Sequence, residues 1–316
     1  MNAVRHYIVR RLLGAVPVLL GISLLAFVLA QLSPGDPAEI MLEAAGTGMP
    51  SAEEVAALHS YLGLDQPAYV QYGLWLWRIL HGDGGISYHL GLPVFTVLLA
   101  RLPVTVMLAA ASLCWAAVGG IGLGLLMARM RGTWAAMLLH GVTQVMLATP
   151  SFLTAILLIL IFGVWLHVLP TNGVDAAAGY LLPSFALALV TLAMTAQLLD
   201  VQLREALASL YAQTARLRGL SEGRVLLTYA LPNALVPVTA MLGNFAAAVL
   251  GGAIIVETVF ALPGIGSLAL DAIHYRDYPL LQGYVLFLGG IYVLVTLAVD
   301  LVLARMDPRI VLGGGD

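Results

Sequence analysis

Long stretches without any charged residue alternate with polar segments along this chain. The first follows three arginines and runs from Leu12 to Leu32, and it is longer than the apolar part of a signal peptide, so we expect it to be retained. Further stretches lie between Arg101 and Arg129, Arg131 and Asp175, Asp175 and Asp200, Arg224 and Glu257, and Asp277 and Asp300. Each is long enough for a helix to cross a bilayer, which takes about 20 residues. The pattern predicts an all-α polytopic membrane protein.

The stretch between Arg131 and Asp175 is too long for one straight crossing, and Pro150 should break it. We interpret "WAAMLLHGVTQVMLA" as a bent or interfacial lead-in and "FLTAILLILIFGVWLHVLP" as the crossing. One crossing there gives six transmembrane helices with both termini in the cytoplasm. Most of the 14 basic residues then lie inside, as the positive-inside rule requires. The arginines left outside are Arg78, Arg101 and Arg276.

Composition supports this class of protein. Hydrophobic residues make up 61% of the chain and charged residues 10%, against about 25% charged in soluble domains. All 14 basic residues are arginines, so the chain lacks the lysine that a phosphate-binding loop needs. We therefore expect no ATPase activity in this chain. The single cysteine, Cys114, excludes an intrachain disulfide and is expected in the core.

The charge pattern divides the chain into three parts. Residues 1–32 form the cytoplasmic N-terminus and first transmembrane helix, residues 33–100 an outer loop with amphipathic helices, and residues 101–316 the core, with a cytoplasmic loop at 200–232. In the outer loop, Ser51 can cap a helix that begins with Glu53 and Glu54. Tyr72 and Trp75 share one face of a second helix, which either lies on the membrane surface or packs in an outer cap.

The segment "YAQTARLRGLSEGRVLLTYALPNAL" (211–235) is polar although it lies between two apolar stretches. Its first part has helical composition and ends in two arginines, and Gly219 can take the left-handed conformation that terminates a helix. Ser221 can cap a second helix with Glu222 in its first turn. That helix runs toward Pro232, which should interrupt it. The sequence predicts a helix, a glycine turn and a second helix facing the cytoplasm.

The spacing in this segment resembles the EAA loop of ABC-importer permeases. The family pattern is E-A-A, three residues, Gly, nine residues and I-x-L-P. Here Gly219 and the Leu-Pro pair match, while Gln213 replaces the glutamate, Thr214 the first alanine and Tyr229 the isoleucine. The resemblance implies that the segment docks on an ATPase. The residues implied in this coupling are Gln213, Thr214, Ala215, Arg216, Arg218, Gly219, Glu222, Leu231 and Pro232.

Other motifs resemble the peptide/nickel branch of these permeases along nearly the whole chain. They are "LSPGDPA", "LGLDQPAYVQY", "HGDGGIS", "GGAIIVETVFALPGIG", "YRDYPLLQG" and the terminal "MDPRI". The resemblance implies a type I ABC importer permease fold. Because "YGLWLWRILH" and "ARLRGL" look closer to the nickel permease, we expect nickel or a nickel–metallophore complex as cargo, with di- or oligopeptides as the alternative.

The family also implies partners and a location. The partners would be a second, homologous permease subunit in a heterodimer, two ATPase subunits that use ATP and Mg, and an extracytoplasmic substrate-binding protein. The chain itself would bind no cofactor and no nucleic acid. It would lie in the lipid bilayer of the cytoplasmic (inner) membrane of a prokaryote.

Polar groups inside spans are candidates for the substrate pathway, because they are costly in a membrane. They are His140, Gln144, Asn244 and Asp300, with Met146 as a soft contact and Glu257 at the outer end of a span. Each could instead make an ordinary interhelical hydrogen bond. The histidines outside, at 59, 81 and 89, match no standard metal site, so any metal ligands stay unknown. Gly120 and Gly124 predict close helix packing.

Two other classes of protein fit the sequence less well. A secondary transporter more often shows inverted repeats and interrupted helices with intramembrane charge, and neither is clear here. An intramembrane enzyme would need a catalytic motif, but the chain contains no G-x-S-x-G or H-E-x-x-H sequence. Neither class explains the spacing around Gly219.

Overall fold

The computed structural model describes residues 2–32, 35–44, 50–173 and 177–306. In this part of the chain the regular structure is helical, and the only β-bridge joins Ile86 to Pro93. The α-helices are α1 (Asn2–Leu32), α2 (Pro37–Ala44), α3 (Ala52–Leu62), α4 (Ala68–Leu80), α5 (Val94–Cys114), α6 (Gly120–Arg129), α7 (Trp134–Ala148), α8 (Ser151–Leu158), α9 (Leu181–Ala208), α10 (Leu210–Leu217), α11 (Glu222–Val225), α12 (Leu231–Gly252), α13 (Ile254–Val259), α14 (Ile265–His274) and α15 (Tyr278–Met306). Short π-helical or 3₁₀ segments are η1 (Trp115–Gly119), η2 (Ile159–Trp165), η3 (Ala177–Tyr180) and η4 (Leu226–Ala230). The "DPRI" end of the terminal motif lies outside the described residues.

The apolar stretches form helices long enough to cross a membrane. Five continuous spans cover Ile8–Leu32, Val94–Arg129, Ala177–Ala208, Glu222–Leu250 and Tyr278–Arg305, and the bent pair α7 and α8 makes up to six. Leucines such as Leu13 and Leu25 project from α1 into the surroundings, as expected for a surface in contact with lipid. The prediction of a polytopic helical membrane protein is confirmed.

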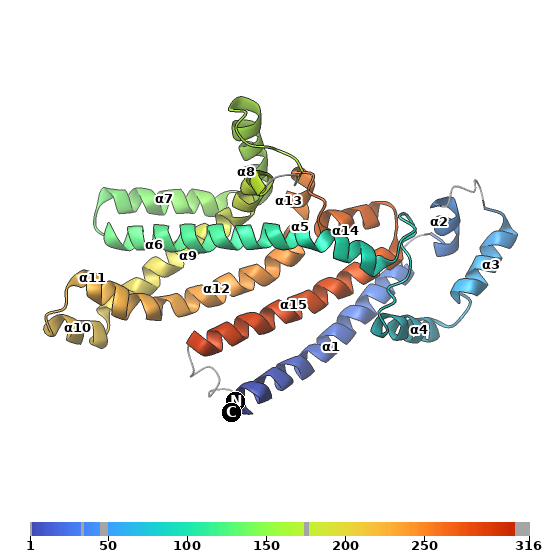
Figure 1. The fold of residues 1–316 in the computed structure, drawn as a ribbon, viewed down its shortest axis with the longest axis horizontal. Helices are drawn as coiled ribbons and strands as arrows, with labels where there is room; N and C mark the ends of the chain where they lie inside the picture. The colour runs from blue at the N-terminus through green and yellow to red at the C-terminus, as the bar shows by residue number, and fades with distance from the viewer. Residues whose placement is uncertain (1, 33–34, 45–49, 174–176, 307–316) are drawn as a thin grey trace.

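The structure chooses between the two alternatives predicted for the segment before Pro150. The proline separates α7 from the α8–η2 segment, which is bent by 102° relative to α7. However, α7 runs beside α6 and packs against α9, while α8 leaves the bundle direction (Figure 1). The amide of Gln197 in α9 donates to the Thr143 hydroxyl of α7 at 2.9 Å. Of the two alternatives, the bent lead-in is therefore the one that the structure supports, because α7 joins α8 at a sharp bend and packs in the bundle.

Small residues bring α6 and α9 close together. A Cβ atom on Gly120 would lie 2.5 Å from Thr195 Cβ, and one on Gly124 would lie 2.8 Å from the Ala196 carbonyl oxygen. Neither position can hold a larger residue without moving α9, so the predicted close packing is confirmed. Cys114, in contrast, is exposed at the end of α5 and not in the core as expected.

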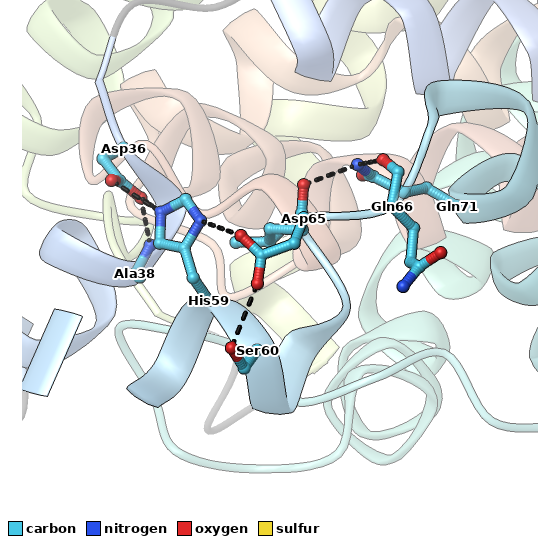
Figure 2. Close-up of polar contacts among 8 residues, drawn as sticks. Asp36, Ala38, His59, Ser60, Asp65, Gln66 and Gln71 are labelled. Carbon is cyan, nitrogen blue, oxygen red and sulfur yellow. Dashed lines mark hydrogen bonds and ion pairs between the residues drawn. The ribbon is translucent and has the colours of Figure 1, made fainter. Parts of the chain in front are cut away.

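The outer loop folds into three short helices held by polar contacts. Ser51 and Glu54 form a reciprocal capping box at the start of α3. His59 Nε2 lies 2.8 and 2.7 Å from the two carboxylate oxygens of Asp36, which links α3 to the segment before α2 (Figure 2). Burial alone would raise the pKa of Asp36, but hydrogen bonds from His59 and from the Ala38 N–H outweigh it and lower that pKa.

The helix α4 packs on the first span. Tyr72 and Trp75 both contact Phe27 of α1, with ring centroids 5.4 and 5.9 Å apart, and the Tyr72 and Ser23 hydroxyls lie 2.8 Å apart. The shared face predicted for this helix therefore covers α1, which favours the packing alternative. The helix α5 begins at Val94, within the range predicted for the outer loop.

Candidate functional site

The segment between α9 and α12 forms a hairpin at one end of the bundle, where α10 and α11 project beyond the neighbouring spans (Figure 1). Gly219 has a φ of +81°, the left-handed conformation that favours glycine. Its N–H donates to the Arg216 carbonyl at 2.9 Å, and the Leu220 N–H donates to the Ala215 carbonyl at 3.3 Å. These bonds satisfy the last carbonyls of α10. The predicted helix, glycine turn and second helix are confirmed.

Arg216 and Glu222 close the hairpin across the glycine turn. Arg216 Nε and Nη2 donate to the two carboxylate oxygens of Glu222 at 2.7 and 3.1 Å. Arg216 Nη1 also donates to the Leu207 carbonyl at 2.9 Å. The hydrogen bond to Glu222 raises the pKa of Arg216. A bidentate pair restricts geometry as well as adding attraction, so α10, α11 and the end of α9 form one unit.

The two faces of α10 differ in character. Ala212 and Ala215 are buried with Val225 in a small core under the hairpin. Leu210 and Leu217 are 81% and 89% exposed on the opposite side. Thr214 lies between them at helical spacing and donates its hydroxyl to the Leu210 carbonyl at 2.9 Å. The hairpin thus presents a stripe of Leu210, Thr214 and Leu217, which we call the outer stripe of α10.

The structure changes the roles expected within this segment. Ala215 is buried inside the hairpin, and Arg216 and Glu222 bind each other. Arg218 is exposed and has no side-chain partner among the described residues. The amide of Gln213 donates to the Ala208 carbonyl at 3.0 Å. The exposed leucines were not predicted, although their spacing of seven residues in a polar helix is a signal for one face.

Pro232 does not interrupt the second helix as predicted. The π-helical turn η4 joins α11 to α12, and one helical span runs from Glu222 to Leu250. A wider turn before the proline relieves the clash between its ring and the preceding carbonyls. Asn233 donates its side-chain amide to the Tyr229 carbonyl at 2.7 Å, within the same stretch. Leu231 and Pro232 thus begin α12, and α11 is continuous with this span.

A buried carboxylate in α9 lies next to basic groups of α7 and of the loop before α7. Asp200 in α9 is 1% exposed and accepts hydrogen bonds from Arg131 Nη2 at 2.9 Å and Arg204 Nη2 at 3.0 Å. His140 Nε2 lies 3.7 Å from the same carboxylate. These four side chains line a cavity of about 450 Å³ together with Met127 and Trp134. Of the predicted pathway residues, His140 therefore lies beside a cavity. Sequence reasoning missed Asp200, although an arginine four residues later is a helix-pair signal.

The other pathway candidates are placed separately. Gln144 and Asn244 are exposed and Met146 is half-buried. Asp300 pairs with Arg11, with Oδ2 and Nε 2.9 Å apart, and so joins α15 to α1. The structure gives Asp300 an interhelical contact, which was the alternative to a role in the substrate pathway.

Glu257, also a predicted pathway residue, is fully buried among neighbouring helices. Its carboxylate accepts from the Thr105 hydroxyl at 2.6 Å and from the Ser267 N–H at 2.9 Å. A Cβ atom on Gly264 would lie 2.2 Å from Glu257 Cδ, and one on Gly266 would lie 2.9 Å from Oε2. The glycines of "ALPGIG" make room for this carboxylate, which joins α5, α13 and α14.

Two family profiles match the chain. One is described as "Binding-protein-dependent transport system inner membrane component" and matches residues 120–312. The other is described as the N-terminal part of a binding-protein-dependent transport system membrane component and matches residues 4–109. Together they cover both the outer segment and the spans that carry the hairpin.

Relatives match over nearly the whole length. A Brucella suis protein whose name places it in a peptide transport system as a permease is 38% identical over 311 residues, covering 96% of this chain and 98% of the relative. The glutathione transport system permease protein GsiC of Escherichia coli K12 is 35% identical over 305 residues, covering 96% and 98%. These names refer to peptides and glutathione and not to nickel, so they favour the alternative cargo over the one expected first.

A solved structure has the same fold. The inward-facing MetNI methionine ABC transporter contains a chain that aligns with a TM-score of 0.56 at 17% identity, covering 67% of this chain and 97% of that chain. The predicted type I importer permease fold is confirmed.

Proposed function

This chain belongs to the family of binding-protein-dependent transport system inner membrane components, and from this premise we propose that it carries short peptides into the cell. As a member, it is a permease subunit of an ABC importer. The peptide cargo rests on one observation: relatives that match 96% of the chain are named for peptide and glutathione transport, and glutathione is a tripeptide. Nickel, the cargo expected first, has no comparable support.

The proposed assembly contains a second, homologous permease, two ATPase subunits and an extracytoplasmic binding protein. The family description, which names dependence on a binding protein, supports the last of these. The lack of lysine supports the need for separate ATPase chains, because a phosphate-binding loop uses lysine on the nucleotide phosphates. ATP and Mg would then act on those subunits. The arginine distribution supports cytoplasmic termini in the inner membrane.

In this proposal the hairpin α10–α11 couples the ATPases to the membrane. The outer stripe of α10 supplies exposed leucines that fit an apolar groove on a partner, and Arg218 supplies a free positive charge next to it. The Arg216–Glu222 bridge keeps the hairpin rigid. Because α11 continues into α12 through η4, a push on the hairpin tilts a span instead of bending a loop. Coupling through a rigid element with two arrangements needs this continuity.

The proposal is tested by uptake of radiolabelled Ala-Ala and of radioactive nickel into cells with and without the gene. We expect deletion to abolish Ala-Ala uptake and the reintroduced gene to restore it, while nickel uptake stays unchanged. Excess unlabelled dipeptide should compete in the parent strain. Loss of nickel uptake with unchanged dipeptide uptake would overturn the peptide cargo and restore the nickel prediction.

A further inference from the structure

Two opposite charges on the outer side of the protein share a cavity without touching each other. Arg101 is half-buried on α5, and Asp271 lies on α14. Both line a cavity of about 170 Å³, yet no ion pair joins them, and neither side chain has a partner among the described residues. Arg101 lies near the start of a membrane-spanning helix, where a charged group is costly unless it has a partner. Asp271 is exposed beside it on the shorter helix α14, so the cavity offers a ligand one positive and one negative group.

The packing beneath the cavity explains why both charges point to it. On α5, Arg101 lies one helical turn after the buried Val97 and Leu98. On α14, Asp271 lies one turn after the buried Leu268. Val97, Leu98 and Leu268 belong to one apolar cluster between α5 and α14. The helices are thus fixed relative to each other just below the two charged groups.

The remaining walls are also held in place. Asp277 is buried and accepts hydrogen bonds from the Ser87 hydroxyl and from the His89 N–H, which ties the loop at 86–92 to the start of α15. The rings of His89 and Tyr275 stack, with centroids 3.6 Å apart and planes 6° apart. The cavity therefore has one preformed wall of two stacked rings, and a ligand would meet little rearrangement there.

We propose that this cavity binds a small zwitterion, the charged ends of a short peptide, as a contact point on the outer side of the permease. A free carboxylate fits the guanidinium of Arg101, which can donate two parallel hydrogen bonds. A free ammonium group fits the carboxylate of Asp271 and can lie against the face of Tyr275. The volume is below the ~300 Å³ usual for a complete ligand pocket, so the site suits a dipeptide or one end of a peptide. The inference rests on the proposed peptide cargo.

Cysteine protection tests this site in membranes that carry the assembled importer, washed free of soluble binding protein. Cys114 is the only cysteine of the chain, so Cys114→Ser gives a clean background. Leu90 lines the cavity and is 40% exposed, and Leu90→Cys places a thiol there. The rate of labelling by a membrane-impermeant maleimide is read from the mass of this chain. Leu80→Cys, in exposed α4 outside the cavity, is the matched control.

Four probes separate the charges: Ala-Ala, N-acetyl-Ala-Ala, Ala-Ala-amide and the doubly blocked peptide. We expect Ala-Ala to slow labelling of the Leu90→Cys variant several-fold, the singly blocked peptides to protect more weakly, and the doubly blocked peptide not at all. Arg101→Gln and Asp271→Asn should each raise the half-protecting concentration about tenfold, as expected when a charge-assisted hydrogen bond is lost. The control variant should be labelled at the same rate with every probe.

Three results would overturn the inference. They are equal protection by all four peptides, equal protection of the Leu80→Cys control, and protection by Ala-Ala that Asp271→Asn leaves unchanged, which would mean a simple anion site. The first two results are read with Arg101 and Asp271 intact, so they do not depend on how the variants of these residues fold. Gene-dependent Ala-Ala uptake without protection would refute this site alone, whereas gene-independent uptake would refute the proposed function.

Discussion

Arg216 spans the Gly219 turn and holds Glu222 with two hydrogen bonds, of 2.7 and 3.1 Å. Both residues were expected to face a partner subunit, but the structure uses them to fix the two arms of the hairpin to each other. Among the residues that the hairpin exposes to a partner, the outer stripe of α10 and Arg218 take no part in this bridge. Three predictions concern the hairpin, and a fourth concerns the packing of α6 on α9.

Replacing Gly219 should uncouple the hairpin. A Cβ atom there meets open space, so the cost comes only from the positive φ, which a β-branched residue strongly disfavours. We expect Gly219→Val to reduce dipeptide uptake about tenfold or more while the amount of protein in the membrane stays similar; a strained backbone of this kind costs about 1–3 kcal/mol. The matched control is Gly223→Ala, which also meets open space but has an ordinary helical φ. Normal uptake by Gly219→Val would remove the turn from the coupling mechanism.

The two arginines of the hairpin should respond differently to loss of charge. Arg216→Gln breaks the bridge to Glu222, so amide hydrogen exchange across 209–230 should become faster even in the isolated chain. Arg218→Gln should leave this exchange unchanged, because Arg218 has no partner among the described residues. It should instead weaken recovery of the ATPase subunits on purification. If both variants gave the same exchange pattern, the internal role of Arg216 would be wrong.

Leu217 should contribute directly to docking. Its side chain is 89% exposed, and burial of a leucine contributes about 1.5–3 kcal/mol, so Leu217→Ser should weaken ATPase binding about tenfold or more. Binding can be measured between detergent-purified permease and added ATPase subunit. Leu80, a similarly exposed leucine on α4, is the control, and Leu80→Ser should have no effect. Unchanged affinity in Leu217→Ser would exclude the outer stripe of α10 as the contact.

Packing of α6 against α9 should tolerate a methyl group at Gly122 but not at Gly120. Gly120→Ala places a methyl group 2.5 Å from Thr195 Cβ and should destabilise the protein by about 1–3 kcal/mol, as overpacking of a core does. Gly122→Ala meets nothing within 4 Å and serves as the control. Thermal unfolding of both variants in detergent measures the difference. Equal stability would show that α9 moves aside at little cost.

Local patterns along the chain were sufficient to predict several features of the fold. The length of the apolar stretches predicted the spans, Pro150 predicted a break, and Ser51 and Gly219 predicted a helix start and a helix end. The spacing of Gly120 and Gly124 predicted close packing. All of these depend on residues a few positions apart, whose preferred conformations the neighbouring sequence already determines.

The sequence by itself therefore determined a helical membrane protein with a glycine-turn hairpin, and through its motifs the permease family. Only the tertiary structure decided that Glu257 is buried against Thr105. It also decided that Arg131 and His140 lie next to the Asp200 carboxylate, and that Arg101 and Asp271 line the same cavity. These partners are far apart along the chain, 152 residues for Glu257 and Thr105. An ionisable residue in an apolar stretch has the same sequence signal whether it binds a partner, a ligand or water. Its role is decided by which helices pack together, because only packing sets what surrounds its charge.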